Sequence, residues 1–231
     1  MRRIIVLNTK GGCGKTTIAT NLASLYAARG FHTALYDYDP QASSSSWLEL
    51  RPSDRPPIYG VATFRSPALG LTRSWQIRLP ANTERLIIDT PASLGKPELL
   101  EQIRGVDQIL VPLAPSAIDI RAAADFIRSL IAANKTIRAR IGIIANRVRE
   151  HSPGLRALQA FLDTVDIPLV TRLRDSQNYL LAADQGLGVH ELDTHRARFD
   201  IPHWERLLEW LETPPAAASQ PLPAHAQLLR A

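Results

Sequence analysis

Residues 3–17 read RIIVLNTKGGCGKTT, an apolar strand that runs directly into a glycine-rich loop. Glycines lack a Cβ atom, so they allow positive φ angles and bring backbone N–H groups close to an anion. Lys15 adds a positive charge for the outer phosphates, and the Thr16 hydroxyl is placed to bind Mg²⁺. A helix that begins near Lys15 directs the positive end of its dipole at the same point. This order of strand, loop and helix predicts a nucleoside triphosphate site.

The whole loop is expected to contribute phosphate contacts, through its backbone as much as through its side chains. Its single cysteine occupies a position that a small residue fits, and the alternative is a thiolate made reactive by the neighbouring lysine. The predicted nucleotide-binding residues of the loop are Gly11, Gly12, Cys13, Gly14, Lys15, Thr16 and Thr17.

The lysine at position 10 departs from the ordinary phosphate-loop pattern. A Walker A loop, GxxxxGK[ST], has glycine where this chain has Thr9, and it makes no demand for a lysine next to it. The stretch KGGCGKTT resembles the deviant Walker A loop of the ParA/MinD family of ATPases. In that family the first lysine reaches the nucleotide of the other subunit. The resemblance therefore implies that Lys10 is a catalytic lysine acting in trans, that ATP is the nucleotide, and that ATP binding forms a homodimer.

A solvent-facing side chain is the alternative for Lys10, because most lysines lie on the surface. The composition favours a function instead. Of 27 lysines and arginines only four are lysine, and two of those four, Lys10 and Lys15, lie in this loop.

Two aspartates follow the second apolar segment, in YDYDPQ at residues 36–41. This stretch resembles the family motif DxDPQ. The resemblance implies that Asp39 positions and activates the attacking water and that Asp37 belongs to the Mg²⁺ shell. Two carboxylates beside a triphosphate would repel it without a metal or a proton-transfer role. Turn or helix-capping aspartates are the alternative for both positions.

A third aspartate ends the apolar run Leu-Ile-Ile, followed by Thr-Pro-Ala. A carboxylate at the end of a strand next to a phosphate loop is the Walker B arrangement, which holds Mg²⁺ directly or through water. Asp89 is therefore expected to be a metal ligand together with Thr16. The segment from Thr90 to Gly95 is then expected to sense the γ-phosphate as a switch.

The stretch VPLAPSAIDIRAAA at residues 111–124 resembles an interface segment of the small ParA-like proteins of the ParF group. Its two prolines, Pro112 and Pro115, lower the entropy lost when the loop becomes ordered. Asp119 has two interpretations. It belongs to the dimer interface, or it is a first-turn aspartate that the helix dipole favours.

Asn146 follows the apolar run Ile-Gly-Ile-Ile-Ala. Relatives often place an adenine-contacting residue at this point, and an asparagine amide can both donate to and accept from the adenine edge. The resemblance therefore implies a nucleotide contact. Asparagine is also common in the turns that follow strands, which is the alternative.

Apolar runs without alternation, separated by helical patterns, predict a doubly wound α/β fold with a mostly parallel sheet and helices on both faces. The expected strands are 4–8, 33–37, 59–64, 85–89, 108–112, 140–146 and 168–172, and the expected helices are 15–29, 43–50, 116–133, 153–165, 177–184 and 201–212. The chain is long enough for one ATPase domain over residues 1–212. Residues 213–231, rich in proline and alanine, are expected to be a disordered tail.

The composition restricts the cellular setting. A single cysteine cannot form an internal disulfide, which fits a reducing cytoplasm. The chain enters its first strand at once, so we expect no signal peptide, and no apolar run reaches the roughly 18 residues of a membrane span. The net charge of +5, carried mostly by arginine, favours an anionic partner.

Three functions are compatible with these features. The first, which we expect, is a Mg²⁺-dependent, slow ATPase of the ParF and McdA type, which binds nucleoid DNA without sequence preference. It positions or segregates a cargo with an adaptor protein that stimulates hydrolysis, and the cargo is a plasmid, a chromosome or a protein-bodied organelle such as a carboxysome. The second is a MinD-like membrane ATPase. Such proteins end in a basic amphipathic helix, whereas residues 213–231 have four prolines and one arginine. The third is a metabolic or metal-handling relative, for which one cysteine provides no metal-binding pair.

The candidate DNA-binding residues are arginine pairs in the second half of the chain. Guanidinium groups suit phosphate contacts, and several such contacts give a steep salt dependence. Scattered, solvated arginines are the alternative for each pair. The pairs are Arg147 and Arg149, Arg172 and Arg174, and Arg196 and Arg198.

Overall fold

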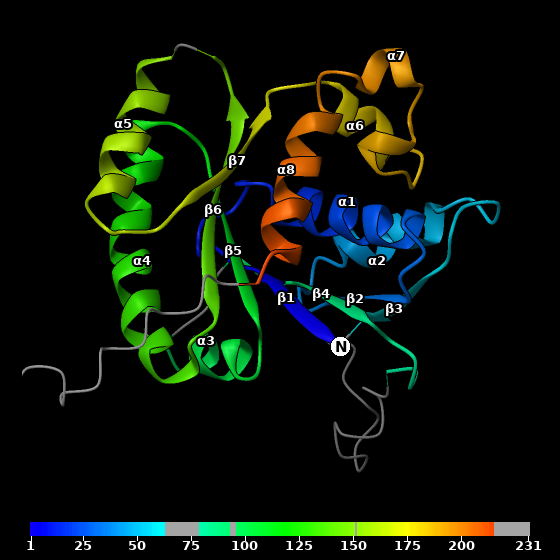
Figure 1. The fold of residues 1–231 in the computed structure, drawn as a ribbon, viewed down its shortest axis with the longest axis horizontal. Coiled ribbons are helices and arrows are strands. Elements are labelled where there is room, and N and C mark those ends of the chain that lie inside the picture. Colours follow the sequence, from blue (N-terminus) through cyan, green and yellow to red (C-terminus); the bar gives the residue numbers. More distant parts are fainter. Residues whose placement is uncertain (63–78, 93–95, 151, 215–231) are drawn as a thin grey trace, which may run out of the picture.

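The computed structural model describes residues 1–62, 79–92, 96–150 and 152–214, the side chains of residues 96–98 excepted (Figure 1). Within them seven strands form one sheet in the order β3-β2-β4-β1-β5-β6-β7, and every neighbouring pair is parallel. The strands are β1 (Arg2–Val6), β2 (Thr33–Asp37), β3 (Ile58–Ala62), β4 (Arg85–Asp89), β5 (Gln108–Leu113), β6 (Arg140–Val148) and β7 (Leu169–Arg174). The predicted doubly wound α/β fold is confirmed.

Helices cover both faces of the sheet (Figure 1). The helices are α1 (Lys15–Ala28), α2 (Ser43–Leu50), α3 (Lys96–Ile103), α4 (Ala117–Ile137), α5 (Pro153–Asp163), α6 (Asn178–Ala183), α7 (Thr194–Ala197) and α8 (Ile201–Glu212), with a short 3₁₀ helix η2 at Val189–Glu191. One apolar core lies between the sheet and α3, α4 and α5. The other lies between the sheet and α1, α2, α6 and α8.

The central strands supply both cores because successive side chains point to opposite faces. In β1, Ile4 and Val6 belong to the core under α1, while Ile5 belongs to the core under α4. All three side chains are fully buried. This double burial explains why the strands are continuous apolar runs in the sequence rather than alternating ones.

The described elements include three that were not expected and several whose bounds differ. Strand β1 spans Arg2–Val6 and not 4–8, β6 continues to Val148, and β7 continues to Arg174. Helix α3, η2 and α7 are additional, and they are short segments that bury few side chains. Helix α4 extends to Ile137 and ends at Arg138, which adopts a positive φ of 61° without being glycine. The expected tail beyond residue 214, and the end of the expected strand beyond Ala62, lie outside the described residues.

Strand β1 lies between β4 and β5, where the direction of winding reverses. From β1 the chain proceeds through α1 to β2 on one side, and β5, β6 and β7 continue on the other. In doubly wound sheets ligands bind at the carboxyl ends of the strands at such a reversal. The topology therefore places the phosphate loop, which directly follows β1, at the expected binding position.

A buried ion pair connects α2 with η2. Arg51 donates from Nη1 and Nη2 to the two carboxylate oxygens of Glu191, at 2.9 and 2.8 Å, and the side chains are only 5% and 4% exposed. Arg51 also donates to the carbonyl oxygens of Pro56 and Gly186, so its guanidinium group bonds three segments of the chain. Burial alone would raise the pKa of Glu191, but the hydrogen bonds and charge of Arg51 outweigh it and lower that pKa.

We predict that Glu191→Ala lowers the free energy of unfolding by about 3–5 kcal/mol, because it leaves the Arg51 guanidinium buried without a counter-charge. Chemical denaturation followed by circular dichroism measures the change. The control is Asp125→Ala, which breaks the exposed Arg128–Asp125 pair on α4 and should change stability by no more than about 0.5 kcal/mol. Equal losses in the two variants would contradict the prediction.

Candidate active site

Asn8 fixes the start of the phosphate loop. Its Nδ2 donates to the carbonyl oxygen of Pro112 at 2.7 Å, and its Oδ1 accepts from the Lys10 backbone N–H at 3.0 Å. Asn8 is 1% exposed. Sequence reasoning did not assign it a role. The available sequence signal for Asn8 was its position as a polar residue directly between a buried strand and the loop.

Two glycines of the loop adopt backbone conformations that other residues avoid. Gly12 has φ 72° and Gly14 has φ 96°, and Gly14 is the N-cap of α1. A Cβ atom on Gly14 would also collide with the side-chain amide of Asn146. Gly11 has neither constraint, so the strict requirement for glycine falls on the second and third positions.

Two side chains of the loop donate to one backbone oxygen. The Lys15 Nζ and the Cys13 Sγ both donate to the carbonyl oxygen of Lys10, each at 3.2 Å. Lys15 is only 7% exposed. Burial raises the pKa of the Cys13 thiol, although the Lys15 charge opposes the shift. Cys13 is therefore a protonated small residue, and the structure gives no support to a reactive thiolate.

Asn146, near the carboxyl end of β6, also supports the loop. Its Nδ2 donates to the Cys13 carbonyl oxygen at 2.8 Å, and the residue is 5% exposed. The amide nitrogen is thus already engaged with the loop. The expected contact between Asn146 and adenine stays a prediction, and the Oδ1 atom would have to make that contact.

The parallel register brings two of the predicted aspartates together. Asp37 at the end of β2 is the register partner of Asp89 at the end of β4, and Asp89 is in turn the partner of Val6. Both carboxylates therefore lie at the edge of the sheet where β1 enters the loop. Their mutual repulsion raises the pKa of Asp89, as a smaller contribution than burial.

Asp89 is fully buried, and burial raises the pKa of its carboxyl group to about 6. The hydroxyl groups of Ser44 and Thr16 oppose this shift because they stabilise the charged form. The Ser44 Oγ donates to Asp89 Oδ2 at 2.5 Å. Within the described residues Asp89 Oδ1 has no hydrogen-bond partner.

An unpartnered, buried carboxylate oxygen next to a threonine hydroxyl fits the oxygen ligands that Mg²⁺ prefers. Asp89 and Thr16 are therefore the side chains that would hold the metal, with nucleotide phosphates and water as its remaining ligands. A bound Mg²⁺ would supply positive charge to the phosphate oxygens.

Asp37 has a structural function in the described contacts. Its Oδ2 accepts from both the backbone N–H and the Oγ of Ser45 at 2.8 Å, and its Oδ1 accepts from the Asp39 N–H at 3.1 Å. These bonds hold the first turn of α2, whose N-cap Ala42 provides no side-chain cap. The geometry matches the capping interpretation of Asp37, and its place in the Mg²⁺ shell stays a prediction.

Asp39 lies in a tight local turn. Its Oδ1 accepts from the Gln41 N–H at 3.0 Å, and its carbonyl oxygen accepts from the Ala42 N–H at 2.9 Å. The residue is half-buried at the same edge as Asp37. The turn uses one carboxylate oxygen, which leaves Oδ2 to meet a water. The predicted role in hydrolysis is compatible with this turn.

The side chain of Lys10 forms an ion pair with Asp119, in the first turn of α4. Helix α4 begins after Ser116, whose Oγ accepts from the Asp119 N–H at 3.1 Å. Asp119 is therefore a first-turn aspartate, as the dipole argument predicts, and it also contacts the phosphate loop.

The six candidate DNA-binding arginines lie at the carboxyl ends of β6 and β7 and around α7. Five of them are exposed, and the exception is Arg174. Arg174 donates to the buried carboxylate of Asp200 at 3.1 Å and packs over the exposed Phe199 ring. The structure thus assigns Arg174 to holding the start of α8. Arg149 pairs with Asp175 at 3.1 Å on the surface.

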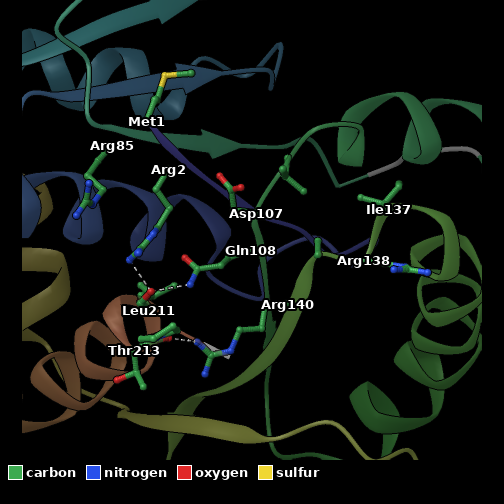
Figure 2. Close-up of a pocket in the computed structure, with 13 residues that line it drawn as sticks. Met1, Arg2, Arg85, Asp107, Gln108, Ile137, Arg138, Arg140, Leu211 and Thr213 are labelled. Atoms are coloured by element: carbon green, nitrogen blue, oxygen red, sulfur yellow. Dashed lines mark hydrogen bonds between the residues drawn. The ribbon is translucent and has the colours of Figure 1, made fainter. Parts of the chain in front are cut away.

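A separate cavity of about 680 Å³ lies at the opposite, amino-terminal edge of the sheet (Figure 2). Four arginines line it, but three are engaged with α8 and its end. Arg2 donates to the Leu211 carbonyl oxygen at 2.6 Å, and Arg140 donates to that of Thr213 at 2.5 Å. Arg85 pairs with Glu212 at 2.9 Å. This cavity is distant from the loop and contributes nothing to the nucleotide site.

Residues 4–189 match the model of the CobQ/CobB/MinD/ParA nucleotide binding domain. The chain is similar to the maintenance of carboxysome distribution protein A of Halothiobacillus neapolitanus, 29% identical over 82% of this chain and 87% of that protein. It is also similar to the protein of the same name from Gloeobacter kilaueensis, 28% identical over 91% and 94% of the two chains.

The fold is shared with solved structures. An ATP complex of Cyanothece McdA superposes with a TM-score of 0.70, covering 94% of this chain and 98% of that one at 17% identity. At this level of identity the likeness concerns the fold.

We predict that Asn146→Ala weakens ATP and GTP binding alike, by about three- to tenfold, because the loss of one buried hydrogen bond costs about 1 kcal/mol. Titration with fluorescent nucleotide analogues measures both affinities. A loss confined to the adenine nucleotide would show instead that Asn146 reads the base.

The matched control is Asn134→Ala. Asn134 also braces backbone, since its side chain bonds Ala139 at 2.7 and 2.9 Å at the end of α4. That variant should lower stability and leave nucleotide affinity unchanged.

Proposed function

The chain belongs to the CobQ/CobB/MinD/ParA nucleotide-binding family, and from that membership we propose that it is a ParA-type ATPase that positions carboxysomes. In this proposal ATP joins two subunits, the dimer binds nucleoid DNA without sequence preference, and an adaptor protein on the cargo stimulates hydrolysis and release. The observation that carries the proposal is the loop with Lys10 and Lys15 at the sheet edge that also holds Asp39 and Asp89.

The proposed chemistry assigns each residue a task. The loop N–H groups and Lys15 bind the phosphates, and Thr16 and Asp89 hold the metal that neutralises them. Asp39 orients the attacking water. Lys10 contacts the nucleotide of the second subunit, and Asn146 keeps the loop in its binding conformation.

The cargo is inferred from the curated relatives. Both proteins named for carboxysome distribution align over more than four fifths of this chain and of their own length. A relationship over the whole domain, rather than over the phosphate loop alone, supports a shared task. The cargo remains a proposal because the ATPase site itself carries no information about it.

DNA binding is supported by the exposed arginines at the carboxyl ends of β6 and β7. Contacts from guanidinium groups to phosphates provide affinity without reading bases. A membrane-bound mode, as in MinD, is the alternative outcome. Among the described residues no helix is both long and apolar enough to cross a membrane.

We predict that Asp39→Ala traps an ATP-bound dimer because water is no longer activated. Light scattering at saturating Mg-ATP should give twice the monomer mass, with hydrolysis lowered at least tenfold. Lys15→Ala should abolish nucleotide binding, whereas Lys10→Ala should keep nucleotide binding and lose the dimer. An Asp39→Ala protein that stays monomeric would overturn the proposed dimerisation.

We predict that the trapped dimer binds any DNA duplex, and that the triple change Arg147→Ala, Arg172→Ala and Arg196→Ala weakens binding. The logarithmic salt dependence should become less steep by roughly 0.9 for each lost phosphate contact. Fluorescence anisotropy with two unrelated duplexes measures both effects. Arg128→Ala, an exposed arginine on α4, is the control and should change nothing.

Binding to anionic vesicles but not to duplex DNA would favour the membrane alternative. Unaltered DNA binding by the triple variant would move the DNA surface elsewhere on the molecule.

A further inference from the structure

The ion pair between Lys10 and Asp119 joins the phosphate loop to helix α4 within one subunit. The Lys10 side chain is 42% exposed and the Asp119 side chain 14% exposed. The carboxylate is therefore largely covered, while the ammonium group lies at the surface. This lysine is the one that the proposed function assigns to the nucleotide of the other subunit.

Asp119 is held in place by its own helix. Lys10 contacts Asp119 Oδ1, while the Ser116 hydroxyl donates to Oδ2. Ser116 also accepts from the Asp119 N–H, as the N-cap of a 21-residue helix. Asp119 is thus a fixed acceptor, whereas Lys10 has a long and flexible side chain. When this pair breaks, the lysine is the partner that moves.

The backbone of the loop does not depend on this ion pair. The Lys10 N–H is bound by Asn8, and Asn8 is bound in turn by the Pro112 carbonyl oxygen. The Lys10 carbonyl oxygen accepts from Lys15 and Cys13. The Lys10 side chain can therefore leave Asp119 while both ends of its own peptide stay bound.

One ammonium group cannot be held against Asp119 and extended to a second subunit without a competition between the two contacts. We infer that Asp119 is a positioning residue that retains Lys10 in its own subunit, so that the nucleotide of the partner must displace the carboxylate before the dimer forms. This inference rests on the proposed function, and it adds a residue that sets the ATP concentration at which dimers form.

The size of the effect follows from the exposure of the pair. Partly exposed ion pairs contribute little free energy, so the Lys10–Asp119 pair makes dimerisation harder without preventing it. Removing the charge should lower the ATP concentration for half-maximal dimerisation by about two- to fivefold. The maximal extent of dimerisation should stay the same.

Asp119→Asn is the direct test because asparagine keeps the shape and can still accept from Ser116. Light scattering across an ATP titration should show the two- to fivefold shift. Asp119→Glu, which restores the charge, should return the midpoint toward that of the wild type. The control is Asp125→Asn, which removes an exposed carboxylate from the same helix. It should leave the midpoint unchanged.

A second measurement does not require dimers. The chain has four lysines, so amine labelling followed by mass spectrometry can compare Lys10 with the exposed Lys135. Without nucleotide, Asp119→Asn should raise the labelling of Lys10 relative to Lys135 by about two- to fivefold. Asp119→Glu should restore the wild-type ratio.

The outcomes separate the two proposals. An unchanged labelling ratio would overturn the retention of Lys10, whether or not dimers form. A raised labelling ratio together with an unchanged or higher ATP concentration for half-maximal dimerisation would overturn the proposed competition for Lys10. Asp119 would then be a residue that orients Lys10 toward the partner subunit. An Asp39→Ala protein that stays monomeric in Mg-ATP would overturn the proposed function, and the labelling ratio would still decide where Lys10 is held.

Discussion

The phosphate loop depends on donors that come from outside it. A loop that turns its N–H groups toward an anion directs carbonyl oxygens elsewhere, and buried carbonyl groups need partners. Asn146 from β6 serves the Cys13 carbonyl, and Lys15 serves that of Lys10. Asn8 binds the Lys10 N–H and is tied to β5. Strands β1, β5 and β6, which are neighbours in the sheet, must therefore be in register for the loop to have this shape.

The charged groups of the site lie at this same edge of the sheet. Burying them there lowers the stability of the fold. Asp89 is buried so completely that its pKa rises to about 6, which means that its charged form is disfavoured by the fold itself. A carboxylate in this condition gains more from a cation than an exposed one does. The site thus retains a disfavoured charge where the proposed metal would bind, as functional sites commonly do.

The sequence predicted the fold and the nucleotide-binding family more closely than the contacts between side chains. Buried strands such as β2 and β4 were assignable to the residue because apolar runs end at aspartates and turns. Helix α3 and the short helices η2 and α7 could not be assigned, because the hydrophobic pattern is weak where few side chains are buried. The bracing by Asn8, the capping by Asp37 and the pairing of Arg174 with Asp200 depend on neighbours brought together by folding. None of these partners is recognisable from spacing along the chain.

The contacts of three arginines with the end of α8 indicate where a fluorescent label can be attached to this molecule. Arg2, Arg85 and Arg140 fasten the last described turn of α8 to the amino-terminal edge of the sheet, and the exposed Met1 lies at that same edge (Figure 2). Strand β1 separates this edge from the phosphate loop. A fluorophore placed at the first residue would therefore lie away from the phosphate loop and from the surface proposed to meet a second copy.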